Sequence, residues 1–422
     1  MADILEELRW RGLVAHATDE AALAAELAAG PVAYYVGFDP TAPSLHVGHL
    51  VQVLTARRLQ DAGHRPLALV GGATGLIGDP KASGERAMNS PEVVAGWTQR
   101  LRRQIEPFLD FTGPAAARMV DNLEWTAPMS AIELLRDVGR HFSVNRMLDR
   151  EAVAARLAAG GISYTEFSYV LLQSNDYLQL HRRHGCRLQL GGSDQWGNIT
   201  AGAELIRRVD AERVHALATP LLTKADGTKF GKTESGAVWL DPELTSPYAF
   251  YQFWLAAEDE RVGTYLRALT FRGREEVEAL EAEAAERPQA RAAQRALARD
   301  VTTLVHGAEA TARAEAASAA LFGRGDLRAL DARTLADAVA ELPVARVGAG
   351  EALEVPRLLA AAGVVPSVSA GRRAVAEGGA YVNNDRVSDA DAPLDASELL
   401  QGRWLVLRRG RRTLGAVEVV PS

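Results

Sequence analysis

The sequence is short of features that would define several protein classes. It has 422 residues and one cysteine, Cys186, which excludes an intrachain disulfide and any metal site built from several cysteines. It also lacks an apolar run of the roughly 20 residues that a membrane-spanning helix needs. Residues 1–11 mix acidic, basic and apolar side chains, so they do not resemble a secretory signal. We therefore expect a cytoplasmic protein with no membrane partner.

A strong excess of one charge is absent as well. The chain has 47 Lys and Arg against 54 Asp and Glu, a formal net charge of −7. This balance argues against unspecific nucleic-acid binding over the whole surface, but it leaves room for a local basic patch. The length predicts two or three domains, and the 47% hydrophobic and 24% charged residues are typical of a globular protein.

Common nucleotide and metal motifs are missing too. The glycine-rich segment 71–80 does not have the G-x-G-x-x-G spacing, and 227–233 is one residue short of a P-loop. His181, His184 and Cys186 have no further ligand at a suitable spacing, so a helix end with two surface histidines explains them better than a metal does. We predict no metal site made of protein ligands, and the sequence offers no clear Ser-His-Asp or Cys-His arrangement.

A strand, a loop and a helix are predicted between residues 32 and 62. Residues 32–38 are apolar and β-branched or aromatic, and 39–44 are typical of a turn. Apolar residues then recur with helical spacing from Val47, so His46 and His49 share a face of the first helical turn. Such a turn offers free N–H groups and imidazole donors to an anion. The alternative is two ordinary surface histidines.

Further strands are predicted at 66–70, 118–122 and 187–190, with helices at 1–31, 91–111 and 132–159. The alternation of strands and helices predicts an α/β fold with a Rossmann-like, doubly wound parallel sheet. Ligands of such sheets bind at the carboxyl ends of the strands, where the loops after 38, 70 and 190 would meet.

A polar stripe interrupts the apolar helix predicted at 167–180. Tyr169, Gln173 and Asp176 recur at i, i+4 and i+7, and buried polar groups need partners. The stripe indicates either a pocket wall that faces a polar ligand or an internal hydrogen-bond network.

The second half of the chain is predicted to contain three parts. Residues 246–322 have a helical pattern, 323–350 form a linker, and 351–422 form a small α+β domain. Residues 345–422 hold ten Arg against nine Asp and Glu, with five Arg within 403–412. Clustered positive charge of this kind suits contact with a phosphate backbone. Upstream, the lysine- and glycine-rich loop 221–233 is typical either of a loop that covers phosphates or of a solvated turn.

Taken together, these segments resemble the class I aminoacyl-tRNA synthetases, and specifically the bacterial tyrosyl-tRNA synthetase family. The tetrapeptide 46–49 is similar to the class signature His-Ile-Gly-His, and Lys229-Phe-Gly-Lys-Thr233 is similar to Lys-Met-Ser-Lys-Ser. Longer family strings stand in the family's order at 37–42, 75–80 and 191–198. The resemblance covers nearly the whole chain.

The resemblance implies roles for individual residues. The residues expected to act on the phosphates of ATP are Thr41, His46, His49, Arg86, Lys229, Lys232 and Thr233. Those expected to bind the substrate tyrosine are Tyr35, Asp79, Tyr169, Gln173, Asp176 and Gln195. Those expected to bind ATP and the adenylate are Gly37, Asp39, Gly48, Gly192, Asp194 and Lys232. RNA contacts are expected from Arg372, Arg373, Arg408 and Arg409.

The chain departs from the family pattern at two places. Val36 stands where several members have a cysteine, and the loop 79–86 is one residue shorter than in some members. The shorter loop leaves open whether Lys81 contacts phosphate.

The resemblance also implies an architecture and a reaction. We expect a catalytic domain at 1–245 with a helical insertion, an all-α anticodon-binding domain at 246–322, and an S4-like RNA-binding domain at 351–422. The expected enzyme is a homodimer that uses ATP with Mg²⁺ to join L-tyrosine to tRNA(Tyr). Three alternatives remain open: a tryptophanyl-tRNA synthetase, a synthetase-like RNA-binding factor without charging activity, and another nucleotidyl transferase of the same fold.

Overall fold

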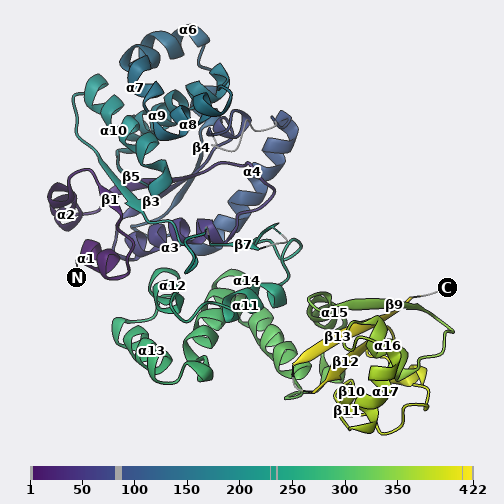
Figure 1. Ribbon diagram of the computed structural model, residues 1–422. Helices are drawn as coiled ribbons and strands as arrows, with labels where there is room; N and C mark the ends of the chain where they lie inside the picture. The colour runs from purple at the N-terminus through teal and green to yellow at the C-terminus, as the bar shows by residue number, and fades with distance from the viewer. Residues whose placement is uncertain (1–2, 81–87, 229, 234–235, 411, 421–422) are drawn as a thin grey trace. The chain divides into compact units, whose positions relative to one another are not determined.

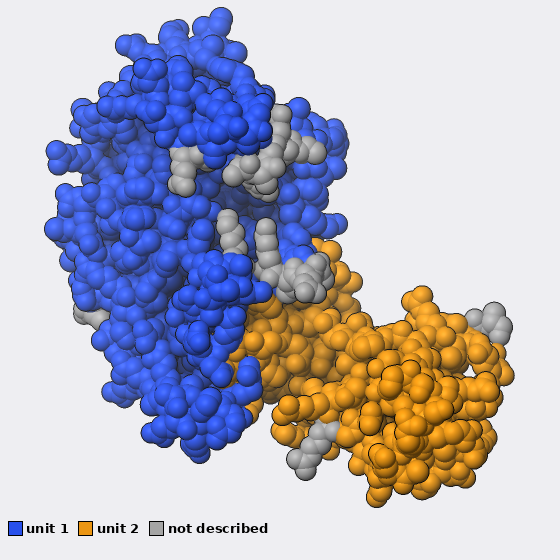
Figure 2. Space-filling model, viewed as in Figure 1, with its two compact units in different colours: residues 1–241, 258–293 blue, residues 242–257, 294–422 orange. Residues whose placement is uncertain are grey.

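The computed structural model describes residues 3–80, 88–228, 230–233, 236–410 and 412–420. The chain divides into two compact units. Unit 1 comprises residues 1–241 and 258–293, and unit 2 comprises residues 242–257 and 294–422 (Figure 2). The predicted domain boundaries remain predictions, because this division groups the chain differently: helices between 258 and 293 belong with the N-terminal sheet.

Unit 1 is built around a largely parallel sheet. Its strands within the described residues are β1 His16–Ala17, β2 Ala33–Phe38, β3 Arg65–Val70, β4 Arg118–Asp121, β5 Cys186–Gly192 and β6 His215–Thr219. They lie in the order β1-β6-β5-β2-β3-β4, and each pair is parallel except β1 with β6. Because β2 lies between β3 and β5, the strand order reverses there. The predicted doubly wound sheet is confirmed, and a ligand site is expected at this reversal.

Helices cover both faces of this sheet (Figure 1). Those of unit 1 are α1 Ile4–Trp10, α2 Glu20–Ala29, α3 Val47–Asp61, α4 Pro91–Ile105, α5 Leu123–Thr126, α6 Ala131–Glu133, α7 Val144–Leu148, α8 Glu151–Ala159, α9 Tyr164–His184, α10 Trp196–Val209, α12 Val262–Leu269 and α13 Arg274–Glu286. Neighbouring side chains of β2 point to opposite faces. The Tyr34 hydroxyl donates to the Ala56 carbonyl in α3, whereas the Tyr35 ring packs against Tyr177 of α9.

Two helical predictions were too long. The segment 1–31 contains α1, β1 and α2, because Gly12 adopts a φ of +70° after α1 and Asp19 caps α2 by accepting from the Ala22 N–H. The segment 132–159 contains most of α6, then a π-type turn at 134–138, a 3₁₀ turn at 139–141, α7 and α8. In both cases the apolar spacing was helical on average, although local turns interrupt it.

Unit 2 combines helices with a second sheet. Its helices are α11 Pro247–Leu255, nearly all of α14 Ala292–Leu321, α15 Ala332–Ala340, α16 Val355–Ala361 and α17 Val368–Ala376. Its strands are β9 Val344–Gly348, β10 Ala380–Val382, β11 Asp385–Arg386, β12 Trp404–Arg409 and β13 Thr413–Val420, in the order β11-β10-β12-β13-β9. The segment predicted as a linker, 323–350, therefore contains α15 and the edge strand β9, which pairs with β13.

The short pair β7 Lys232–Thr233 and β8 Gly236–Ala237 completes the strands of the described residues. Each unit has its own apolar core. One cluster lies between the central sheet and α9 and α10, and another lies between α16, α17 and the sheet of unit 2. Among the described residues, no helix is both long enough and apolar enough to cross a membrane.

Candidate active site

A pocket of about 460 Å³ lies at the carboxyl ends of β2 and β5, beside the start of α3. This is the place where the strand order reverses. The predicted site residues that line it are Tyr35, Gly37, Asp39, Thr41, His46, Gly48, His49, Asp79, Tyr169, Gln173, Asp176, Gly192, Asp194 and Gln195. Residues separated by up to 160 positions in the chain thus share one cavity, although their individual roles remain predictions.

One end of the pocket is a buried polar pair. The side chains of Tyr35 and Asp176 are each about 1% exposed. Among the described residues, the Tyr35 hydroxyl has no hydrogen-bond partner. Burial raises the pKa of this phenol well above its ordinary value, and the negative charge of Asp176 raises it further. The hydroxyl is therefore protonated and available to a polar ligand, which makes this end suited to a single hydroxyl group.

Two side chains that the sequence analysis did not identify hold Asp176. The Asn122 amide donates to one carboxylate oxygen at 2.9 Å, and the Trp125 indole N–H donates to the other at 2.8 Å. Burial raises the pKa of Asp176 to about 8, against the opposing effect of these two donors. Asn122 follows β4 and Trp125 lies in the short α5, so neither is part of a periodic pattern. No signal in the sequence distinguished them.

Hydrogen bonds also fix Asp39 and Asp79. Asp39 accepts from the Tyr169 hydroxyl and from the Thr74 hydroxyl, both at 2.6 Å. Asp79 accepts from the Gln195 amide at 2.8 Å and from Asn198 at 3.1 Å. These hydroxyl and amide donors hold both carboxylates in place. The carboxylates can attract a cationic group such as an ammonium.

Part of the polar stripe on α9 is not satisfied internally. Gln173 has a buried amide oxygen without a hydrogen-bond partner among the described residues, and so does Gln189, on β5. Both line the pocket. An unpaired buried acceptor costs free energy, on the order of 1–3 kcal/mol. The arrangement favours a pocket wall that faces a ligand over a closed internal network. Gln189 was not among the predicted site residues.

The other end of the pocket carries the two imidazoles at the start of α3. His49 Nδ1 accepts from the His46 N–H, and His46 Nδ1 accepts from the Gly48 N–H, both at 3.1 Å. An Nδ1 that accepts leaves the proton of a neutral imidazole on Nε2. Desolvation and the neighbouring His46 lower the pKa of His49 to about 3, so this ring is neutral at pH 7. The pair therefore offers N–H donors rather than a base.

Gly48 is required between these rings. A Cβ at this position would lie 2.8 Å from His46 Cε1 and 3.0 Å from His46 Nδ1. Any larger residue would displace the imidazole. The rings of His46 and His49 have centroids 4.0 Å apart, so a shift of one would disturb the other.

The segment after the lysine-rich loop is bonded to the same helix start. The Val47 N–H donates to the Val238 carbonyl at 3.0 Å, and the Leu240 N–H donates to the Leu45 carbonyl at 2.9 Å. The Trp239 ring lies 6.1 Å from the His46 ring between their centroids. The Val238 N–H in turn donates to the Gly231 carbonyl at 3.0 Å, so main-chain hydrogen bonds connect the two signature segments through Val238.

Several predicted residues cannot be placed in the pocket. Arg86, Lys229 and Lys81 lie outside the described residues, as do the side chains of Lys232 and Thr233. Arg372, Arg373, Arg408 and Arg409 belong to unit 2, on α17 and β12.

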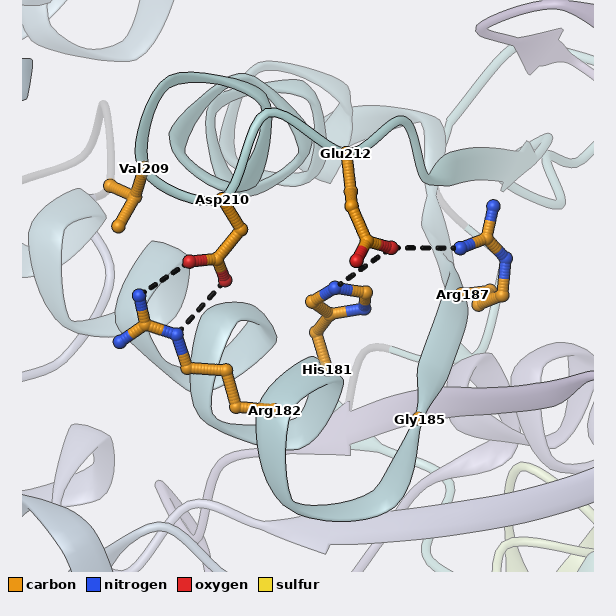
Figure 3. Close-up of a pocket in the computed structure, with 7 residues that line it drawn as sticks. All are labelled: His181, Arg182, Gly185, Arg187, Val209, Asp210 and Glu212. Carbon is orange, nitrogen blue, oxygen red and sulfur yellow. Dashed lines mark hydrogen bonds and ion pairs between the residues drawn. The ribbon is translucent and has the colours of Figure 1, made fainter.

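A larger hollow of about 740 Å³ lies at the other end of β5, where that strand begins (Figure 3). Its charged side chains neutralise one another. Arg182 binds Asp210 through two hydrogen bonds of 2.9 and 2.6 Å, and Glu212 is shared by His181 and Arg187 at 3.4 and 3.2 Å. We therefore assign the function to the pocket at the carboxyl ends of the strands.

Comparisons with known proteins agree with this geometry. Residues 27–323 match the family model of class I tRNA synthetases (W and Y), and residues 334–416 match the model of a tyrosine–tRNA ligase SYY-like C-terminal domain. A tyrosine–tRNA ligase of Kineococcus radiotolerans is 69% identical over 99% of both chains, and one of Streptomyces coelicolor is 65% identical over 99% of both. A C-terminally truncated mitochondrial tyrosyl-tRNA synthetase of Coccidioides posadasii superposes with a TM-score of 0.66 at 30% identity, covering 74% of this chain and 91% of its own.

Proposed function

This chain belongs to the class I tyrosine–tRNA ligases, and we propose that its pocket activates L-tyrosine with ATP and then transfers the tyrosyl group to the 3′-terminal ribose of tRNA(Tyr). In the first step, a carboxylate oxygen of tyrosine attacks the α-phosphorus of ATP and pyrophosphate leaves. In the second step, a ribose hydroxyl attacks the carbonyl carbon of the adenylate and AMP leaves.

The observation that carries this proposal is the buried Tyr35 hydroxyl, which lies beside Asp176 and has no hydrogen-bond partner within the described parts of the chain. A substrate phenol would fill this gap by bonding both groups. Phenylalanine would leave both unpaired, which is the basis of discrimination by a hydrogen-bonding pocket. Tyrosyl-tRNA synthetase is the standard example of this effect. At the other side of the substrate, Asp79, Tyr169 and Gln173 are proposed to hold its ammonium group, with Gln195 in support.

ATP is proposed to lie toward the start of α3. The substrate carboxylate is already a nucleophile, so the first step requires positioning and charge stabilisation rather than a general base. The ring N–H donors of His46 and His49 suit that need, as do Thr41 and the positive end of the dipole of α3. Gly37, Asp39, Gly192 and Asp194 are proposed to contact the adenosine and the adenylate. Gly192 leaves no room for a side chain, because a Cβ there would lie 2.6 Å from an Asp194 oxygen.

The cations of the loop 221–233 are proposed to meet the pyrophosphate. By resemblance, these cations are Lys229 and Lys232, and the Thr233 hydroxyl and Arg86 from the loop 79–86 are proposed to join them. Mg²⁺ is proposed to arrive on the ATP phosphates, because Asp39 and Asp79 are already engaged by hydroxyl and amide donors. When bound, the ion would neutralise charge on the leaving pyrophosphate.

The remaining domains are proposed to bind tRNA. We propose a catalytic domain at 1–245, an all-α anticodon-binding domain at 246–322 and an S4-like domain at 351–422 after the segment 323–350. Support for RNA contact comes from exposed Arg372 and Arg373 on α17 and exposed Arg409 on β12. Arg408 stacks over the Tyr381 ring at 4.1 Å. A cytoplasmic location follows from this role in translation.

A homodimer is proposed because unit 1 exposes an unusual set of apolar side chains between residues 132 and 164. They are Ile132, Leu135, Val144, Leu148, Leu157 and Tyr164, with exposed fractions from 37% to 73%. Several exposed apolar side chains within one stretch of the chain are consistent with a subunit interface. Sedimentation equilibrium that gives the monomer mass at micromolar concentration would contradict this assembly.

Pyrophosphate exchange tests the pocket directly. The full-length protein is incubated with ATP, Mg²⁺ and labelled pyrophosphate, with tyrosine, tryptophan or phenylalanine in parallel. We expect exchange with tyrosine alone. Exchange that prefers tryptophan would replace the proposal with the tryptophan enzyme, and no exchange with any of the three would argue for an RNA-binding role without charging.

A further inference from the structure

Helix α12 contacts the lysine-rich loop, although no motif marks this helix. Tyr265 lies within α12, and its hydroxyl donates to the Thr223 carbonyl at 2.9 Å. The ring of the same residue stacks on Phe230, with centroids 4.3 Å apart and planes inclined by 35°. Tyr265 is about 1% exposed, and burial raises its pKa to about 12, so its hydroxyl is a donor at neutral pH.

A second contact comes from Glu258, which precedes α12 in the chain. The Glu258 carboxylate accepts from the Ala225 N–H at 2.6 Å. The backbone between these contacts is a compact turn: Phe230 N–H donates to the Leu222 carbonyl, and Lys224 N–H donates to the Thr228 carbonyl. Tyr265 and Glu258 therefore hold two points of one turn, which begins at Leu222 and is closed by Phe230.

The same turn reaches the pocket wall. Leu222, Phe230 and Gly231 all line the pocket. Gly231 has a φ of +84°, and a Cβ there would collide with a methyl group of Val47. No side chain other than hydrogen fits between this residue and the start of α3. The position of the turn is thus set on one side by α12 and on the other by the helix that carries the two histidines.

From these contacts we propose that Tyr265 is a positioning residue for adenylate formation, with Glu258 as its second anchor. The ring of Tyr265 packs against the Phe230 ring at one end of the turn. Its hydroxyl binds the Thr223 carbonyl at the other end. Together they determine where the segment with the lysines stands relative to bound ATP. This inference rests on the proposed function, because it concerns the ATP side of that reaction.

The effect of each contact can be separated by substitution. Tyr265→Phe keeps the ring but removes the hydrogen bond, and we expect adenylate formation to slow about fivefold. Tyr265→Leu also removes the stacking on Phe230, and we expect a loss of about twentyfold. Glu258→Ala should slow the step about threefold, while Glu258→Gln keeps an acceptor for the Ala225 N–H and should restore most of the rate.

The measurement is the single-turnover rate of tyrosyl-adenylate formation at saturating tyrosine and ATP, with the dissociation constant of tyrosine determined on the same samples. The inference predicts slower adenylate formation in Tyr265→Phe and Glu258→Ala at an unchanged tyrosine affinity. Wild-type rates in both variants would overturn it. So would a parallel loss of rate and of tyrosine affinity, because that pattern indicates a general disturbance of the fold.

Tyr34→Phe is the matched control. Its buried hydroxyl also donates to a backbone carbonyl, that of Ala56, but it lies on the α3 face of the sheet, away from the turn. We expect this variant to lower the melting temperature without slowing adenylate formation. If Tyr265→Leu does not fold, Tyr265→Phe and the Glu258 pair still decide the question. A wild-type protein that forms no tyrosyl-adenylate would instead overturn the proposed function itself.

Discussion

At the scale of single residues, Asp176 is a group whose chemistry is strongly altered by folding. It is buried, it accepts hydrogen bonds from Asn122 and Trp125, and its pKa is raised to about 8. The resemblance to a known family predicts the roles of Asp176 and Tyr35 from the sequence alone. It could not identify Asn122 and Trp125, because they act through Asp176 and lie at the end of a strand and in a single helical turn.

The raised pKa of Asp176 predicts a pH dependence of stability. An unfolded aspartate has a pKa of about 3.9, so between about pH 4 and pH 8 the folded protein binds more protons at this site than the unfolded chain does. The contribution of Asp176 to the free energy of unfolding must therefore fall as the pH rises through this range. Asp176→Asn should remove this decline. Urea unfolding at pH 5 and pH 8 gives the free energy of unfolding of both proteins. An equal change in this free energy between the two pH values in wild type and Asp176→Asn would contradict the raised pKa of Asp176.

Loss of the carboxylate also predicts a loss of activity. In Asp176→Ala, a substrate phenol loses the carboxyl group of Asp176 as a hydrogen-bond partner and keeps only Tyr35, so tyrosine-dependent pyrophosphate exchange should fall by more than 100-fold, equivalent to about 3 kcal/mol. Circular dichroism should show an intact fold. Exchange at the wild-type rate would mean that the phenol binds elsewhere.

At the scale of elements, the strand–loop–helix from β2 to α3 was predictable because its apolar spacing, turn residues and histidines all agreed. The interruption of 1–31 by β1 was not, because a strand of two residues leaves no periodic signal. The same holds for β9, which is defined by its pairing with β13 some 70 residues later. Similarly, the contact of α12 with the turn 222–231 is a tertiary one that helical spacing cannot reveal.

The start of α3 makes a prediction at this scale. Gly48→Ala places a Cβ within 3.0 Å of two His46 ring atoms, so the ring must move away from its position. We expect the rate of adenylate formation to fall at least tenfold, because one donor to the phosphates is lost, while tyrosine affinity changes little. Stopped-flow fluorescence gives both quantities. The control is Gly96→Ala in α4, where a Cβ meets no atom within 4 Å and an unchanged rate is expected. An unchanged rate in Gly48→Ala would mean that His46 has no role in adenylate formation.

At the scale of the whole molecule, the sequence predicted the catalytic sheet and a separate C-terminal α+β region, but it did not predict how the helices between them divide. Unit 1 takes α12 and α13, while unit 2 takes α11 and nearly all of α14. α11 and α12 are rich in aromatic and aliphatic residues, whereas α13 and α14 are rich in Ala, and this difference in composition does not follow the division into units. Long-range packing determines the grouping. RNA contact and dimer formation stay predictions at this scale.

The two units predict separable activities. Replacing both Arg372 and Arg373 with Ala removes two exposed positive charges from α17. Pyrophosphate exchange should be unchanged, while the KM for tRNA should rise on the order of tenfold, with a weaker salt dependence. Arg346→Ala, which removes an arginine from β9 of the same unit, serves as the control. A double variant that charges tRNA with the wild-type KM would exclude this surface from RNA binding.

The most direct test of the central claim is to charge a bacterial tRNA pool with labelled tyrosine, using the full-length protein with ATP and Mg²⁺. We expect label that precipitates with tRNA, is released by mild base and is confined to tRNA(Tyr). We also expect no charging with phenylalanine or tryptophan, and none with tyrosine in Asp176→Ala. The proposed function would be contradicted if the wild-type protein did not charge tRNA with tyrosine, or if the Asp176→Ala variant charged it equally well.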